Sequence, residues 1–475
     1  MSFEPLQLIK DKMQELNLAA LIIPTNDPHF SEYPPAHWSI REWASGFTGS
    51  AGTLVVTRDK AGLWTDSRYF IQAERELEGS GIDLHRVTDR SSPGITEWLS
   101  KMIENGQTVA ALRKLTSLSQ FQKYDKAFTS KNIKLKLIDD FFSEIWLERP
   151  ALPKDTIFEH ELIYTGLSRQ DKIKAIREVM QENNCSYHLV TTLDDIAWIL
   201  NLRSTDVSCN PVFISYLLIA KETCFLFTKE EKTPAQLMQK LITENIFIYE
   251  YSHVFQKLAA LPEGTHILLD NAFVNMEIQE CLEGKTRVSK ALPSIDMKAI
   301  KSDTEIHNFR KCMVKDGVAL TYAFKWLEDN LEKQSVSEYA FAERIAHQRS
   351  QMENYFGESF NAIVGYNANG AIVHYRADKK NAANISKKGI LLTDCGGQYK
   401  DGTTDITRTI SMDGQPTAEQ KTAYTAVLKG HIALACARFP EGTTGVQLDS
   451  FARMHLWKQG LNFSHGTGHG VGFFN

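Results

Sequence analysis

Helical and strand patterns of hydrophobic positions alternate along the first 295 residues, and the pattern repeats once. Residues 13–25, MQELNLAALIIPT, are typical of a helix that runs into a buried strand, and residues 180–192, MQENNCSYHLVTT, have the same order. Residues 52–68 and 215–231 each contain two apolar strands around a short charged turn. Because the matching segments keep nearly the same spacing along the chain, the pattern predicts two α/β domains of similar plan.

Two breaks in the pattern divide the chain. Residues 147–155, LERPALPKD, combine two prolines with mixed charge, as linkers often do. Near residue 296 a second break precedes a long amphipathic pattern, where Ser302 and Glu305 fit a capping box at a helix start. We predict three domains, with the bounds 1–152, 153–295 and 296–475.

The composition narrows the class of protein. At about 150 residues per domain, 475 residues suit three domains, and 43% hydrophobic with 23% charged residues is ordinary for a soluble chain. A formal net charge of −5 provides no basic surface for nucleic acid. The N-terminus is amphipathic with early acidic residues, and no run approaches the ~18 apolar residues of a membrane span. The sequence therefore predicts a cytoplasmic protein that binds neither nucleic acid nor membrane.

The cysteines indicate a reducing compartment. There are seven, none forms a CxxC pair, and an odd number leaves one over from any pairing. We expect reduced cysteines that lie mostly in the core. Cys395 follows Asp394 in a predicted strand, and alternation along that strand would point its thiol away from the carboxylate face.

The first candidate site is the segment LLTDCGGQYKDGTTDITRTI at residues 391–410. Residues 391–395 and 403–410 have strand patterns around a glycine-rich reversal, which predicts a hairpin. Symmetric pairing would place Asp394 opposite Asp405, with Cβ atoms about 5 Å apart and like charges in repulsion. A bound cation would relieve this repulsion. The alternative is that both carboxylates are solvated turn or edge residues.

The second candidate is HGTGHGVGFFN at residues 465–475, in which glycine alternates with other residues. Alternation predicts a strand with side chains on one face and bare backbone on the other. In such a strand His465 and His469 lie about 13 Å apart, so one would be a metal ligand and the other would contact substrate. The alternative is a flexible glycine loop with incidental histidines.

The third candidate is His374, which ends an apolar run after an Asn-Gly turn in residues 360–377. Strand histidines of this kind are usually structural. By itself, this residue therefore gives little indication of function.

Three motifs together resemble one family, the Xaa-Pro aminopeptidases (aminopeptidase P). They are TDCGGQYKDGTTDITRT and LNFSHGTGHGVG, which are specific, and the weaker LWTDSRYFIQAE near the N-terminus. The resemblance covers the whole chain and is greatest for the long, cytosolic, three-domain form. It implies an α/β (α+β) fold, with two creatinase-like N-terminal α/β domains before a pita-bread metallopeptidase domain of the kind shared with prolidase, methionine aminopeptidase and creatinase.

The same resemblance implies a metal site. Asp394 and Asp405 match the family's first two carboxylate ligands, and His469 matches its histidine ligand. It implies two divalent ions, for which carboxylates with one imidazole suit Mn²⁺, while Zn²⁺ or Co²⁺ could occupy the same site. A hydroxide between the ions would attack the peptide bond.

Substrate contacts follow from the resemblance as well. His374 and His465 match the histidines that hold the substrate and stabilise the tetrahedral intermediate, and Arg68 matches an arginine that contacts substrate. The implied activity is release of the N-terminal residue from peptides with proline second, by a homodimer. Two alternatives remain, a prolidase that cleaves Xaa-Pro dipeptides and a pita-bread module that binds peptides without metal.

One feature departs from the family pattern. The resemblance implies two further glutamate ligands downstream of the HGTGHGVG segment, and the sequence ends at Asn475. Two divalent ions carry four positive charges, whereas Asp394 and Asp405 supply two negative ones. We therefore expect a C-terminally truncated, inactive piece of a longer enzyme, with an incomplete third domain and disorder or altered strand pairing from about residue 296.

Overall fold

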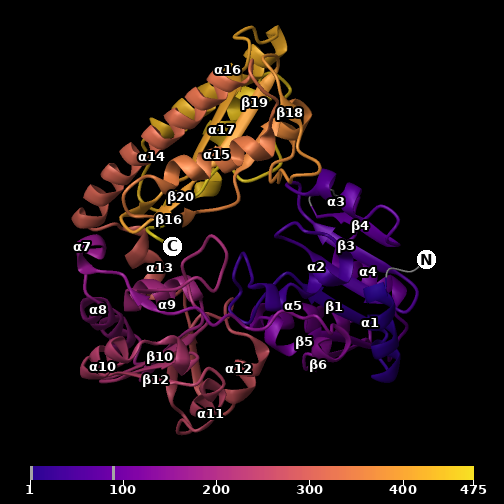
Figure 1. Cartoon of the computed structure of the whole chain (residues 1–475). Coiled ribbons are helices and arrows are strands. Elements are labelled where there is room, and N and C mark those ends of the chain that lie inside the picture. Colours follow the sequence, from indigo (N-terminus) through magenta and orange to yellow (C-terminus); the bar gives the residue numbers. More distant parts are fainter. Residues whose placement is uncertain (1–3, 88–90) are drawn as a thin grey trace.

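The computed structural model describes residues 4–87 and 91–475, which form three bodies (Figure 1). The N-terminal body and the middle body each contain a six-stranded sheet. The third body begins with the long helix α14 (Asp303–Asn330) and lies at the top of the view in Figure 1. None of the helices in these described ranges has the length and apolarity needed to cross a membrane.

The first sheet has the strand order β4-β3-β2-β1-β5-β6. The central strand β1 pairs antiparallel with β2 and parallel with β5. The strands are β1 (Ala20–Pro24), β2 (Thr53–Thr57), β3 (Ala61–Thr65), β4 (Ile82–Arg86), β5 (Thr108–Leu112) and β6 (Lys134–Ile138). The helices are α1 (Glu4–Glu15), α2 (Ile40–Ser45), α3 (Phe70–Glu76), α4 (Ile95–Met102), α5 (Leu118–Thr129) and α6 (Phe142–Ile145).

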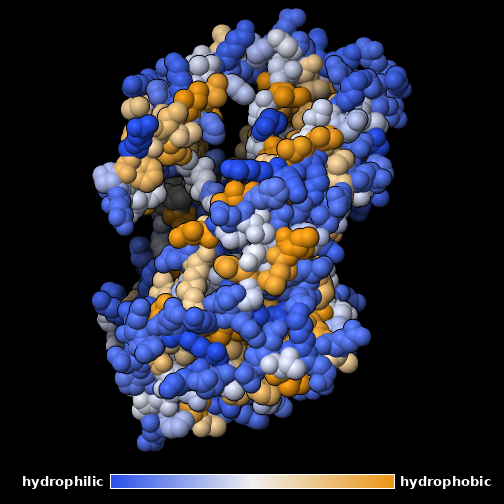
Figure 2. Space-filling model, turned by 90° about the vertical axis from the view of Figure 1, so that its left-hand side faces the viewer, coloured by the Kyte–Doolittle hydropathy of each residue, from blue (hydrophilic) through white to orange (hydrophobic). Residues whose placement is uncertain are grey.

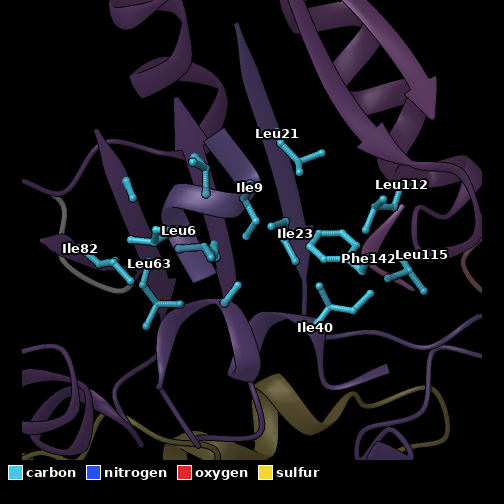
Figure 3. Packing of buried hydrophobic residues seen from close by; sticks show 14 of the residues in the cluster. Leu6, Ile9, Leu21, Ile23, Ile40, Leu63, Ile82, Leu112, Leu115 and Phe142 are labelled. Atoms are coloured by element: carbon cyan, nitrogen blue, oxygen red, sulfur yellow. The ribbon is translucent and has the colours of Figure 1, made fainter. Parts of the chain in front are cut away.

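Helix α1 shows why this body folds. Its buried residues Leu6, Ile9 and Met13 recur every three or four positions, so they share one face of the helix. Figure 3 shows Leu6 and Ile9 in one cluster with Leu21 and Ile23 of β1. Burial of this face removes apolar side chains from water. Each Å² of buried apolar surface contributes about 25 cal/mol, and this is the main favourable free energy of the layer.

The second sheet repeats the first, with the order β12-β11-β10-β8-β13-β14. Every neighbouring pair has the same parallel or antiparallel sense as its counterpart, so the predicted repeat of an α/β plan is confirmed. The strands are β8 (Tyr187–Val190), β10 (Tyr216–Ala220), β11 (Cys224–Phe227), β12 (Ile246–Tyr249), β13 (His266–Leu269) and β14 (Thr286–Ser289). The helices are α8 (Arg169–Glu182), α9 (Leu193–Leu200), α10 (Ala235–Thr243), α11 (His253–Ala259), α12 (Met276–Cys281) and α13 (Pro293–Ala299), while α7 (Leu162–Thr165) and the ribbon of β7 (Phe158–Glu159) and β9 (Leu202–Arg203) lie beside them.

The third body starts at the predicted capping box. Ser302 Oγ accepts a hydrogen bond from Glu305 N at 3.2 Å, and Glu305 Oε2 accepts one from Ser302 N at 2.8 Å. Three short sheets follow, ordered β17-β19-β22, β16-β20-β21 and β15-β18. Their strands are β15 (Val336–Ser337), β16 (Tyr355–Glu358), β17 (Ile363–Tyr366), β18 (Asn384–Ile385), β19 (Ile390–Cys395), β20 (Gly397–Tyr399), β21 (Gly402–Thr403) and β22 (Ile406–Ser411), and the remaining helices are α15 (Glu338–Ser350), α16 (Ala418–Ala435) and α17 (Gly445–Trp457).

The expectation of disorder or altered pairing from residue 296 is wrong for this structure, which has helices and paired strands through the region. The reason is a local core. Val364, Leu391 and Cys395 of the β17-β19-β22 sheet pack with Phe341 and Ile345 of α15. This sheet therefore buries its inner face against the helices that precede it in sequence.

A buried histidine makes the middle body sensitive to acid. His188 lies on β8, its side chain is fully buried, and its Nδ1 atom is 3.0 Å from the Leu268 carbonyl oxygen of β13. Its Nε2 atom has no hydrogen-bond partner among the described residues. Burial lowers the pKa of His188 to about 4.

We predict that the free energy of unfolding falls as pH drops from about 6.5 to about 4. In that window His188 stays neutral in the folded chain but is protonated in the unfolded chain, which costs up to about 3 kcal/mol. The free energy of unfolding is measured by urea denaturation at these pH values. In His188→Gln it should fall less steeply with decreasing pH than in wild type. His253→Gln, at an exposed position of α11, is the control. Parallel pH curves for wild type and His188→Gln would contradict the prediction.

Candidate functional site

The hairpin of β19 and β22 carries the two aspartates, but its register differs from the prediction. Asp394 pairs with Thr407 and not with Asp405. The chain reverses in a two-residue turn at Lys400 and Asp401, which is flanked by the pair of Tyr399 and Gly402. Relative to the predicted register, this turn shifts the partner of each residue by two positions. Asp405 lies two residues before Thr407, so it is on the same face as Asp394, as a diagonal neighbour.

Asp394 is a carboxylate with one unsatisfied oxygen. Its Oδ1 atom is buried and has no hydrogen-bond partner among the described residues, while the nearby hydroxyl of Thr407 acts to lower the pKa of the carboxyl group. Burial is the largest cause that raises the pKa of Asp394, and the charge of Asp405 adds to it. Repulsion between the two aspartates therefore acts in the expected direction but is secondary to desolvation.

Asp405 and His469 face each other. The Nε2 atom of His469 lies 3.4 Å from Oδ2 of Asp405, and its Nδ1 atom lies 2.7 Å from the Gly470 carbonyl oxygen. Because a carbonyl can only accept, Nδ1 carries a proton and donates it to Gly470. In a neutral ring, Nε2 then presents a lone pair to a carboxylate. This is the tautomer and backbone contact that metal-ligating histidines usually have.

The segment that contains His469 is not the predicted strand. Residues 461–475 contain no strand or helix, and a Cβ atom added at Gly466, Gly468 or Gly470 would meet nothing within 4 Å. A strand needs a hydrogen-bonded neighbour, and the described residues provide none for this segment. The side chain of His469 is 74% exposed, and no group of three or more His, Cys, Asp and Glu residues in the described ranges converges tightly enough to hold an ion. The structure therefore assembles the Asp405–His469 pair and not a complete ligand set.

His374 lies in a turn after the short helix η4 (Asn367–Ala371), and not at the end of a strand. Its Nδ1 atom is 2.6 Å from the hydroxyl oxygen of Tyr69, from the N-terminal body. The next residue, Tyr375, donates its hydroxyl to the buried carboxylate of Glu338 on α15 at 2.8 Å. The loop around His374 is therefore fixed from two sides. Burial, and next the charge of Arg68, lower the pKa of His374.

Arg68 and His465 lie at the same junction between the first and third bodies. Arg68 donates two hydrogen bonds of 2.8 Å to Asp66, from Nε and Nη2, and this contact raises its pKa. Ser67 Oγ donates to the Ser464 carbonyl oxygen at 2.7 Å, immediately before His465. His465 is half-buried, with its ring centroid 4.8 Å from that of Phe463.

A buried ion network supports strand β19 from behind. Arg349 is fully buried, with its Nε atom 2.7 Å from Asp316 and its Nη1 atom 2.8 Å from Glu358. Its Nη2 atom lies 3.3 Å from Cys395 Sγ, on the strand face opposite Asp394. Burial raises the pKa of Cys395 to about 11. The thiol thus points into the core, as alternation predicts, and stays protonated near neutral pH.

Two residues of the junction were missed by the sequence reasoning. Tyr69 and Ser67 contact the loops of His374 and His465, at separations of 305 and 397 residues along the chain. The only sequence signal was that both lie in LWTDSRYFIQAE, beside Arg68. No local sequence pattern predicts a contact between residues so far apart in the chain.

Family models match the chain in three parts. Residues 5–145 and 148–305 each match a Creatinase/Prolidase N-terminal domain. Residues 307–474 match Metallopeptidase family M24, and this match includes Asp394, Asp405 and the three candidate histidines.

Relatives match over almost the whole chain. "Probable Xaa-Pro aminopeptidase P" of Leptosphaeria maculans is 36% identical over 484 residues, which cover 99% of this chain and 78% of the relative. The chain belongs to the Xaa-Pro aminopeptidase P family. A family member from Ajellomyces capsulatus, of the same printed name, is 36% identical over 98% of this chain and 76% of its own length.

A solved structure of the family has the same fold. The X-prolyl aminopeptidase of Caenorhabditis elegans is 31% identical, with a TM-score of 0.91 over 96% of this chain and 76% of that one. That protein is described as a cytosolic enzyme with a di-nuclear active site. The expected architecture of two creatinase-type domains and an M24 domain is therefore confirmed, whereas the domain bounds 1–152, 153–295 and 296–475 stay predictions.

Proposed function

We propose that the whole protein acts as a metal-dependent aminopeptidase, which removes the N-terminal residue from peptides with proline at the second position. The observation that carries the proposal is the Asp405–His469 pair beside Asp394. A carboxylate oxygen and an imidazole nitrogen, which are both common metal-binding atoms, lie 3.4 Å apart, where one cation could be shared by both. Family membership supports the substrate class.

The donor atoms fit divalent metal ions. Asp394 adds a buried carboxylate oxygen without a hydrogen-bond partner in the described ranges, on the same hairpin face. Two carboxylates with one imidazole suit Mn²⁺, and Zn²⁺ or Co²⁺ can use the same donors. We propose two ions, as in the C. elegans enzyme, which would polarise the scissile carbonyl and activate water.

The junction with the N-terminal body supplies the substrate-binding groups in this proposal. His374 and His465 hold the peptide and stabilise the tetrahedral intermediate, and Arg68 contacts the substrate. The bidentate contact with Asp66 fixes the guanidinium of Arg68, whose side chain is 27% exposed. Burial and Arg68 keep His374 neutral, so it can donate a hydrogen bond to an oxygen of the substrate without carrying charge.

The partners follow from this activity and from the surface. We propose peptide substrates in the cytoplasm, with no role for nucleic acid or membrane, and support comes from the net charge of −5 and the cytosolic C. elegans relative. We further propose a homodimer. Exposed apolar residues such as Val314 and Tyr322 on α14 offer surface for association. Figure 2, which looks onto the left-hand side of Figure 1, shows hydrophobic residues in orange on that face. Sedimentation at the mass of one chain would contradict the dimer.

We predict that Asp405→Asn weakens Mn²⁺ binding at least about a hundredfold and abolishes peptidase activity. The substitution removes a negative charge and the oxygen that faces His469. Metal content after dialysis against Mn²⁺, together with calorimetric titration, provides the measurement. Asp413→Asn, an exposed aspartate just after the same hairpin, is the matched control. Unchanged Mn²⁺ affinity in Asp405→Asn would remove this residue from the ligand set.

We predict that His374→Ala lowers kcat about 10²- to 10³-fold while metal stays bound, because it removes a hydrogen-bond donor to the substrate and no ligand. Steady-state kinetics and metal content are measured on one preparation. Loss of metal from this variant would show that the assignment of His374 is wrong.

We predict turnover of Xaa-Pro-Yaa peptides and slower turnover of Xaa-Pro dipeptides. Proline contributes no N–H to the scissile bond, so selectivity must come from recognition of its ring and of the chain on either side. Peptide series that differ only in length, assayed with Mn²⁺, check this. A preference for the dipeptides would favour a prolidase, and saturable binding without cleavage or metal would favour a peptide-binding module.

A further inference from the structure

The turn Asp66–Tyr69, which follows β3 of the N-terminal body, contacts both histidine loops of the third body. Tyr69 reaches His374 at 2.6 Å, and Ser67 reaches the carbonyl of Ser464 beside His465 at 2.7 Å. Two residues of this four-residue turn therefore contact the loops that carry both candidate substrate histidines.

Tyr69 is rigidly held. Its side chain is 2% exposed and belongs to the core cluster of the N-terminal body. Its ring meets Phe47 edge-on, with centroids 5.9 Å apart, and the Arg68 guanidinium lies 5.2 Å from the ring centroid. A Cβ atom added at Gly49 would lie 2.6 Å from the ring, so the backbone also encloses it. The position of the hydroxyl is thus set by the core of the N-terminal body.

The hydroxyl of Tyr69 has two partners and one proton. Its oxygen is 2.6 Å from Ser50 Oγ and 2.6 Å from His374 Nδ1. Burial raises the pKa of Tyr69, so the phenol remains protonated. Either hydroxyl can donate in the contact between Ser50 and Tyr69, and in the arrangement proposed below Ser50 is the donor, so that the single phenol proton is directed to Nδ1 of His374.

The imidazole ring of His374 then carries its proton on Nε2. Burial first, then the charges of Arg68 and His465, lower the pKa of His374, whereas Asp66 acts in the opposite direction; the net shift is downward, so the neutral ring carries one proton. An Nδ1 atom that accepts from Tyr69 places this proton on Nε2. Nε2 has no hydrogen-bond partner within the described part of the chain and remains available as a donor.

We propose that Tyr69 is a positioning residue that holds His374 in the Nε2–H tautomer, so that the core of the N-terminal body sets the hydrogen-bond polarity of the catalytic domain's histidine. This inference rests on the proposed role of His374 for its effect on catalysis, but the tautomer itself does not depend on that role. Neutral His374 thereby presents a donor, not an acceptor, to a substrate oxygen.

The direct test is the ¹⁵N–¹H correlation spectrum of the histidine rings in the whole chain without substrate. The His374 signals are assigned by their loss in His374→Ala. We expect a pyrrole-like Nε2 and a pyridine-like Nδ1 in wild type, and a mixture of both tautomers in Tyr69→Phe. Wild-type signals with the proton on Nδ1 would overturn the proposal, whatever the result for Tyr69→Phe.

Kinetics test the consequence. Tyr69→Phe keeps the ring and removes only the hydroxyl, so kcat on an Xaa-Pro-Yaa peptide should fall about tenfold with KM unchanged. The matched control is Tyr164→Phe, which removes a tyrosine hydroxyl bond to Asn354 of 3.2 Å between the middle and third bodies, and leaves both kcat and the tautomer unchanged. A wild-type-like tautomer in Tyr69→Phe would overturn the proposal. A mixed tautomer with unchanged kcat would instead leave Tyr69 as the positioning residue and refute the role of His374.

Discussion

The register of one hairpin controls the candidate metal site. The turn at Lys400 and Asp401 places Asp394 opposite Thr407, and this brings Asp405 onto the same face two positions away. A slip of one residue would move one aspartate to the core face, where Cys395 and Arg349 lie. Gly396 protects this arrangement, because a Cβ atom there would lie 2.0 Å from the Thr404 carbonyl oxygen.

Contacts between bodies complete the site that the hairpin begins. The N-terminal body contributes Tyr69 and Ser67 at the histidine loops. The middle body holds the end of the glycine-rich segment, since Arg203 donates to the Phe474 carbonyl oxygen at 2.6 Å. Within the third body, Phe474 N donates to Thr403 Oγ1 of β21 at 2.8 Å. Thus the creatinase-type bodies are part of the site's framework. Although these two bodies share one plan, each makes a different contact with the third body.

Local patterns predicted much of the fold. The repeat, the capping box at Ser302 and the burial of Cys395 all depend on periodicity within a few residues, which the sequence displays directly. The predicted register of the hairpin was wrong because a glycine-rich composition does not reveal which two residues occupy the turn. The strand predicted within residues 465–475 was wrong because alternation describes a strand only where a neighbouring strand supplies hydrogen bonds. The contact of Tyr69 with His374 depends on the docking of two bodies, which no segment encodes alone.

The central claim is that Asp394, Asp405 and His469 form the metal-binding part of the site. Anomalous diffraction at the manganese absorption edge, from crystals of the whole protein grown with Mn²⁺, tests it most directly. We predict anomalous peaks within bonding distance of the carboxylates of Asp394 and Asp405 and of Nε2 of His469. Manganese bound only elsewhere on the chain, with these three side chains free of it, would contradict the account.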